Sequence, residues 1–175
     1  DGRYIYFAPF IGSTPECILR YDTHGEFKSS TSWRVYDARP HDKLGITGYM
    51  GAVYAQRYVY FVGFSNFGGM VLRYDTESNF ADTNSWLSYV VGNKNNGFHD
   101  YEGATFDGRY IYLVPNVANQ SSFSPESGQF VRYDTSLPFT NESSWSSFSY
   151  LNTEGSNRFA YQGAVYDGRY VYFAP

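Results

Sequence analysis

Bulky side chains alternate along the segment from Arg169 to Phe173. Arg169, Val171 and Phe173 fall on one side of an extended chain, and Tyr170 and Tyr172 fall on the other. A period of two residues is typical of a β-strand. A strand with one solvated face would carry a polar residue at every second position, whereas here both faces are bulky and mostly apolar. The pattern therefore predicts a strand in a sheet that is covered on both sides.

This segment belongs to a repeat that covers the whole chain. Its opening block, which reads Tyr-x-Gly-Ala and then Arg-Tyr-Val/Ile-Tyr, occupies residues 49–63, 101–115 and 161–175, and its second half also forms residues 1–9. A block ending in Arg-Tyr-Asp-Thr follows three times, and each time a Phe and then a Ser-Trp pair come after it. Repeats of roughly 40–50 residues indicate sheets arranged radially, and this unit is slightly longer.

Each unit is predicted to form four strands. The first covers residues 163–166 in the last copy, and the second covers 169–173. Asp167-Gly168 between them favours a type I′ hairpin turn, in which both central residues have positive φ. The third strand carries Leu-Arg-Tyr-Asp, and the fourth begins at the Trp. Ala55-Gln56 replaces Asp-Gly in one copy and predicts a different turn there, because positive φ is unfavourable for both residues.

We therefore expect an all-β fold, a β-propeller of four-stranded antiparallel blades with about three blades in this chain. The expected blade boundaries lie near residues 1–48, 49–100, 101–160 and 161–175, and the last blade is partial. Gly-Ala in the first strand is expected to let inner strands converge on the axis. Three blades do not easily close a ring, so the expected partners are further copies of the chain or the rest of a longer parent chain. In a strand-complemented dimer, the terminal hairpin of one copy would complete the incomplete first blade of the other, giving six blades.

The unit resembles the kelch type of propeller repeat. The matching features are the hairpin ending in Tyr-Val-Tyr-Phe, the Arg-Tyr-Asp-Thr block, and the Trp that opens the outer strand at positions 33, 86 and 145. Kelch repeats usually carry a Gly pair after the second strand, where this chain has Phe-Ala-Pro or Leu-Val-Pro. The resemblance implies a propeller shape. It implies no single function, because such propellers serve as binding scaffolds, oxidases and sugar-binding domains.

Composition and charge narrow the function classes. Aromatic residues make up 21% of the chain, which favours pleated sheets, and the formal net charge of −4 lacks the basic character of a nucleic-acid-binding surface. No apolar run is long enough for a membrane-spanning helix, so no membrane insertion is expected. The single Cys17 excludes an intrachain disulfide and is expected to be a buried, inert thiol rather than a nucleophile.

Arginine recurs at two positions of the unit. It opens the second strand as Arg3, Arg57, Arg109 and Arg169, and it precedes Tyr-Asp in the third strand as Arg20, Arg73 and Arg132. A functional interpretation makes these residues a set of anion-binding groups. Since a single-site enzyme rarely needs one residue in every blade, we favour a structural role, in which each Arg pairs with Asp22, Asp75 or Asp134 or with backbone carbonyls.

The sequence predicts no metal, cofactor or catalytic residue. Its histidines, His24, His41 and His99, occupy non-equivalent positions of the repeat, whereas a zinc or copper site needs converging ligands. No nucleophile with a base and an orienting acid can be assembled from the visible motifs.

The residues before each inner strand are the best candidates for ligand binding. They are Tyr49-Met50, Tyr101-Glu102 and Tyr161-Gln162. In a propeller, the loop into the first strand reaches the mouth of the central channel, so these residues are expected to share one surface. The constant Tyr is expected to be architectural, while the variable residue is placed where specificity can arise, with Glu102 as the best polar contact. The loop from Asn116 to Gln129 is the second candidate surface.

The function predicted from these features is a non-enzymatic binding or scaffold module of the lectin-like or cell-surface kind. The expected ligand is a glycan or a protein, and an extracellular or cell-surface location is favoured. Two alternatives stay open: a fragment of a propeller enzyme that acts on glycans, and a purely structural repeat that assembles with itself.

Overall fold

The computed structural model describes residues 1–10, 17–43, 45, 48–64, 69–91, 101–116, 129–149 and 161–175. Within these ranges the fold is all-β and antiparallel. Four short 3₁₀ turns accompany the strands in the described residues: Ser30–Ser32, Arg39–His41, Thr83–Ser85 and Glu142–Ser144.

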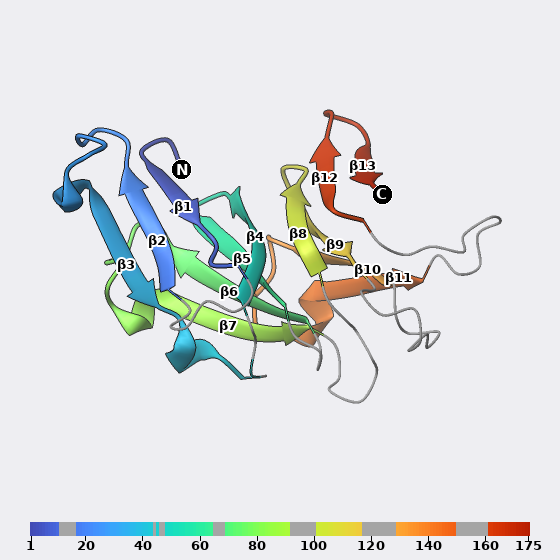
Figure 1. Ribbon diagram of the computed structural model, residues 1–175. Coiled ribbons are helices and arrows are strands. Elements are labelled where there is room, and N and C mark those ends of the chain that lie inside the picture. The colour runs from blue at the N-terminus through green and yellow to red at the C-terminus, as the bar shows by residue number, and fades with distance from the viewer. Residues whose placement is uncertain are drawn as a thin grey trace.

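The strands form four separate sheets in chain order (Figure 1). The first sheet has three strands, β1 (Tyr4–Phe7), β2 (Cys17–Asp22) and β3 (Trp33–Asp37). The second sheet has four strands, β4 (Gly48–Ala55), β5 (Tyr58–Phe64), β6 (Gly69–Asp75) and β7 (Trp86–Val91). The third sheet has β8 (Tyr101–Phe106), β9 (Tyr110–Pro115), β10 (Gln129–Asp134) and β11 (Trp145–Ser149). The terminal hairpin has β12 (Gly163–Tyr166) and β13 (Val171–Ala174). The four-strand unit predicted from the repeat is therefore confirmed.

The inner strands of successive sheets lie side by side. Strand β8 contacts both β4 and β12, and Figure 1 shows all three pointing the same way. A Cβ atom built on Gly51 of β4 would lie 3.1 Å from Cα of Gly103 in β8. The predicted convergence through Gly-Ala is thus seen at Gly51. A Cβ on Gly103 or Gly163 would meet no atom within 4 Å, so the close approach restricts only one of the three glycines.

The hairpin turn differs from the predicted type I′ geometry. Gly108 and Gly168 have φ of +102° and +103°, but neither preceding Asp has positive φ. Instead, the carboxylate of Asp107 accepts the N–H groups of Arg109 and Tyr110, at 2.8 and 2.6 Å, and Asp167 does the same in the terminal hairpin. The prediction was wrong because it assigned the Asp a turn conformation, whereas its side chain caps the turn.

The turn of the second sheet differs from these two, as the Ala55-Gln56 substitution predicts. Gln56 stands where the other copies have Gly and takes a φ of +59°. Its side-chain amide donates a 2.9 Å hydrogen bond to the Thr135 hydroxyl of the third sheet. This contact between sheets helps to hold a backbone conformation that is costly for a non-glycine residue.

Two hydrophobic cores fill the seams between the sheets. The first joins Ile18 and Tyr36 of the first sheet to Phe61, Leu72 and other residues of the second. The second core joins the opposite face of the second sheet, including Tyr60 and Val71, to the third sheet. The second sheet is therefore covered on both faces, as predicted for each unit. The prediction is wrong for the terminal hairpin, where Tyr170 and Tyr172 are each 53% exposed because no further sheet packs on that face among the described residues.

A glycine substitution tests the convergence of the inner strands. We expect Gly51→Ala to lower the free energy of unfolding by about 1–3 kcal/mol, because the methyl group must push apart two backbones that pack closely. Gly103→Ala is the matched control, since its methyl group meets open space. Urea unfolding of both variants measures the difference, and equal effects would contradict the close approach of β4 and β8.

Candidate functional site

The variable residues of the Tyr-x-Gly-Ala motif lie at one end of the three inner strands. Met50 and Glu102 lie near the starts of β4 and β8, and Gln162 lies immediately before β12. These strands point the same way in Figure 1. A Cβ atom built on Gly51, next to Met50, would lie 3.4 Å from the carbonyl oxygen of Glu102. We call the surface made by Met50, Glu102 and Gln162 the inner rim.

Two inner-rim residues are placed by β-bulges. The register of β4 against β5 shifts between Tyr49 and Gly51, and that of β8 against β9 shifts between Tyr101 and Gly103. Met50 and Glu102 are therefore the extra residues, with no partner across the ladder. Bulges commonly re-aim a side chain, and they are over-represented next to active sites. The carboxylate of Glu102 accepts a hydrogen bond from the Asn116 amide, and Gln162 is exposed.

The constant tyrosines serve the packing of the sheets. Tyr49 and Tyr101 are each only 1% exposed, and burial raises the pKa of Tyr101 well above its usual range. Tyr161 is half-buried against the rings of Phe130 and Phe173. The Tyr49 N–H donates to the Pro9 carbonyl at 2.7 Å, which ties the start of β4 to the preceding sheet. Of the six predicted ligand-binding residues, Tyr49 and Tyr101 are thus buried, whereas Met50, Glu102 and Tyr161 are partly exposed and Gln162 is exposed.

Three of the four second-strand arginines pair with aspartates, as predicted for a structural role, whereas Arg169 has no carboxylate partner among the described residues. Arg3 bonds Asp22 at 2.7 Å, Arg109 bonds Asp134 at 2.8 Å, and Arg57 bonds both Asp75 and Glu77. The Arg3 guanidinium holds the pKa of Asp22 at about 2. Arg109, together with Ser136, holds the pKa of Asp134 far below its usual range.

The third-strand arginines Arg20 and Arg73 have a role that could not be predicted from the sequence. Instead of pairing with a repeat Asp, they stack on aromatic rings. The guanidinium of Arg20 lies 4.1 Å from the ring centre of Tyr4 and 4.3 Å from that of Phe80 in the next sheet. Arg73 repeats the arrangement with Tyr58 at 4.2 Å and Phe139 at 4.7 Å. A planar cation between two rings suits such a seam, and each contact contributes about 0.5–2 kcal/mol.

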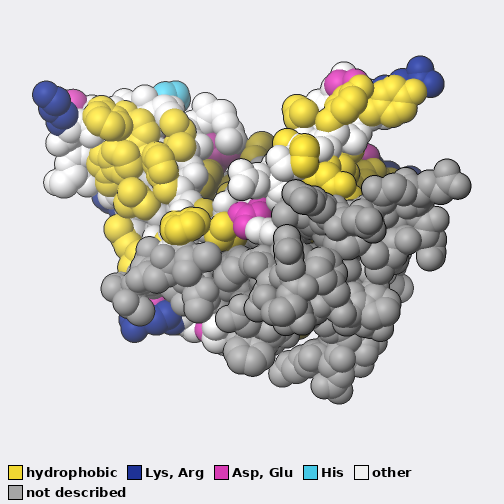
Figure 2. Space-filling view, turned by 45° about the vertical axis from the view of Figure 1, so that its right-hand side comes forward, with side chains coloured by type: hydrophobic (Ala, Val, Ile, Leu, Met, Phe, Trp, Pro, Cys, Tyr) yellow, Lys and Arg dark blue, Asp and Glu magenta, His cyan; other side chains and the backbone are white. Residues whose placement is uncertain are grey.

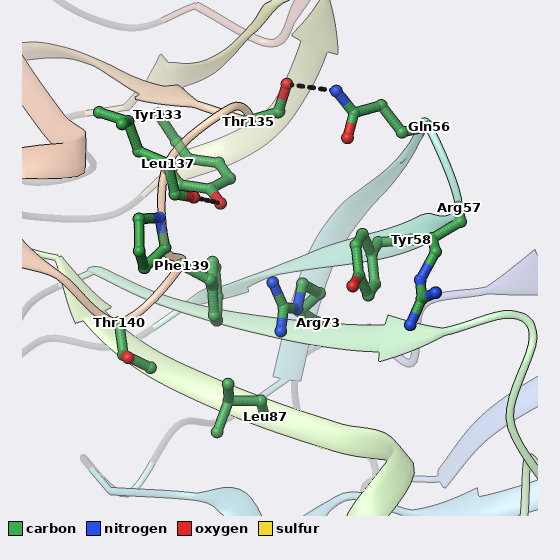
Figure 3. Close-up of a pocket in the computed structure, with 11 residues that line it drawn as sticks. Gln56, Arg57, Tyr58, Arg73, Leu87, Tyr133, Thr135, Leu137, Phe139 and Thr140 are labelled. Atoms are coloured by element: carbon green, nitrogen blue, oxygen red, sulfur yellow. Dashed lines mark hydrogen bonds between the residues drawn. The ribbon is translucent and has the colours of Figure 1, made fainter.

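A groove of about 670 Å³ opens beside the second of these stacks (Figure 3). Arg73 lies between Tyr58 and Phe139, and Gln56 spans the groove to Thr135. The guanidinium, hydroxyl and amide groups could hydrogen-bond a small polar molecule here. This surface was not predicted from the sequence, although Gln56, which replaces the Gly of the other hairpin turns, lies in it.

The remaining candidates give no assembled site within the described ranges. His41 accepts or donates a 2.8 Å hydrogen bond with the Tyr36 hydroxyl, and burial lowers the pKa of its imidazole. No group of three or more His, Cys, Asp or Glu among the described residues could hold a metal ion. His99 and most of the loop from Asn116 to Gln129 lie outside the described residues. In that same described part of the chain, no helix has the length and apolar character needed to cross a membrane.

Comparisons of the chain with protein-family models, with curated proteins and with solved structures found no match.

The Arg–Asp pairs predict how stability depends on pH. The folded-state pKa of Asp22 lies at about 2, below the ordinary value near 4, so its stabilising effect is present above about pH 4 and is lost as the pH falls toward 2. The same direction holds for Asp134. We expect Asp22→Asn to lower the melting temperature at pH 7 and to flatten its decline between pH 4 and 2. Calorimetry at several pH values measures this, with the exposed Glu26→Gln as control. An unchanged acid profile would contradict the pairing.

Proposed function

We propose that the chain forms blades of a β-propeller and acts as a non-enzymatic binding module. Face-packed four-stranded sheets with inner strands running the same way support the propeller arrangement. The resemblance to kelch repeats is part of the same proposal. The ring is completed by further units of this type, from another copy or from a longer parent chain.

The inner rim is the proposed ligand site. The observation that carries this assignment is a separation of roles within the repeat. The constant tyrosines are packed, and the constant arginines are paired with aspartates or stacked on rings in the two complete sheets, whereas the residue that varies between copies lies at the rim. Variation on a rigid scaffold allows specificity to change without loss of the fold.

The rim chemistry suits a polar ligand with hydrogen-bonding groups, such as a glycan or a protein surface loop. Glu102 supplies acceptor oxygens, Gln162 supplies both donors and acceptors, and Met50 supplies an adaptable apolar contact. Glu102 is held in place by Asn116 rather than by an ion pair, so its carboxylate keeps hydrogen-bonding capacity. This chemistry favours a lectin-like or cell-surface role for the binding module.

Substitution of Glu102 tests the ligand site. A glycan array and a pull-down with the intact chain would first identify the ligand. Glu102→Ala is then expected to weaken binding at least about tenfold, the loss of about one charge-assisted hydrogen bond. Glu26→Ala is the matched control, because Glu26 is exposed and lies in the loop after β2, away from the inner rim. Unchanged affinity of Glu102→Ala, or blank results in both screens, would overturn the assignment.

A further inference from the structure

The same contact between faces occurs twice within the chain. At the first seam, Phe80 covers Arg20, and Trp86 stacks on Tyr36 with 4.1 Å between ring centres and a 4° angle. At the second seam, Phe139 covers Arg73, and Trp145 stacks on Tyr89 at 5.1 Å and 14°. We call the face with the Phe and Trp the leading face and the face with the Arg the trailing face. Each leading face thus packs on the trailing face of the preceding sheet.

The leading face of the first sheet has no sheet packed against it in the described structure. Phe27 is 66% exposed, whereas its equivalents Phe80 and Phe139 are 3% and 2% exposed. Phe7 is 44% exposed, whereas its equivalent Phe61 is fully buried. Figure 2 shows hydrophobic side chains gathered over the first sheet, at the left, and over the terminal hairpin, at the upper right. The residues that build a core elsewhere in the chain therefore form an apolar surface here.

The trailing face of the third sheet is only partly covered. The terminal hairpin places Phe173 against Phe130, with 4.6 Å between ring centres. Beside it a cavity of about 490 Å³ remains, lined among others by Arg132, Ser146 and Phe148. Arg132 lies 4.3 Å from the Tyr110 ring centre, but no Phe covers its other side among the described residues. Phe148 is 61% exposed, whereas its equivalent Tyr36 is 6% exposed.

We propose that a second copy of this chain packs the leading face of its first sheet on the trailing face of the third sheet. In this interface, Phe27 of the second copy covers Arg132, and Trp33 stacks on Phe148. The two internal seams show this geometry with the same residue types, so the occupant is argued from the chain's own packing. The inference rests on the proposed propeller arrangement and specifies its partner contact. An exposed apolar surface of this kind is typical of an interface.

Strands β1 and β13 compete for the same place in this assembly. Residues 1–9 and 167–175 differ only at Ile5 and Val171, and both strands are the second strand of a unit. Among the described residues, β13 pairs only with β12, while β1 pairs with β2 in the register Tyr4 to Asp22. We therefore place β13 of one copy against β2 of the other, in place of β1. The joined sheet then has four strands, β12 and β13 from one copy and β2 and β3 from the other.

The charges support this exchange. Arg3 bonds Asp22 in the first sheet, and Arg169 is its equivalent in the terminal hairpin. Arg169 has no carboxylate partner among the described residues, whereas Arg3, Arg57 and Arg109 each have one. In the exchanged sheet, Arg169 reaches Asp22 of the other copy. The contact joins two different faces, and each copy carries both of them, so two copies can close a ring of six sheets.

Two substitutions on opposite faces test the interface. The wild-type chain is expected to show a mass that rises with concentration in analytical ultracentrifugation and to reach twice the chain mass. Phe27→Asp and Phe148→Asp should each remain monomeric when alone, because each removes one of the two faces. Mixed together, they should form a 1:1 complex through the one interface that both variants leave intact. Leu137→Asp, at an exposed apolar residue elsewhere, is the control and should associate as the wild type does.

Arg169→Ala tests the strand exchange itself. It is expected to weaken association several-fold while leaving the unfolding of the monomer unchanged, because Arg169 forms no ion pair within the described chain. A monomeric wild type at every concentration, or single variants that still associate, would overturn the interface. Neither result would affect ligand binding at the inner rim, and loss of rim binding would leave the association intact.

Discussion

The Arg–aromatic contact between successive sheets is the interaction on which the rest of the structure depends. Each seam places a guanidinium between a Tyr of one sheet and a Phe of the next, and a Trp stacks beside it on a second ring. The Trp is itself fixed, because its indole N–H donates to the Phe carbonyl six residues earlier in all three copies, at 2.9–3.0 Å. The Trp side chain thus stabilises the loop before its own strand and also packs on the neighbouring sheet. The repeat therefore encodes the packing between sheets as well as each sheet.

The same constraint determines where variation is tolerated. The second-strand Arg, the third-strand Asp and the following Thr form a closed set of contacts at the turn end of each complete sheet, for example through the 2.6 Å hydrogen bond from Thr76 to the Arg57 carbonyl. Substitution there disturbs several contacts at once. Among the described residues, the opposite end of the inner strands shows no such set, and two β-bulges place Met50 and Glu102 outside the ladder. Residues at this end can therefore vary while the seams remain intact.

Much of the fold could be predicted from the sequence, because a repeat multiplies weak local signals. Alternation and the recurring Trp predicted the four strands of each unit. The role of the third-strand arginines could not be predicted, since Arg73 and Phe139 meet only after two sheets pack together. The turn was predicted wrongly because Asp-Gly fits two geometries, and the choice depends on which N–H groups the Asp carboxylate accepts. The inner rim was predicted as a set of positions, but the bulges that expose it are a property of strand pairing.

The packing also explains why the ends of the chain differ from its middle. Burial of a large apolar side chain contributes about 1.5–3 kcal/mol to the free energy of folding. The exposed Phe7 and Phe27 do not make this contribution, whereas their buried equivalents do. Polar substitution at these positions would remove that apolar surface from an isolated unit at little cost to its fold. The chain instead keeps a Phe at every copy of position 27, and on the opposite face Arg132 is covered by Tyr110 but, among the described residues, by no Phe on its other side. Both outer faces of the chain thus carry residues of the kind that form its internal seams. This is expected of a chain that packs against similar sheets on each side.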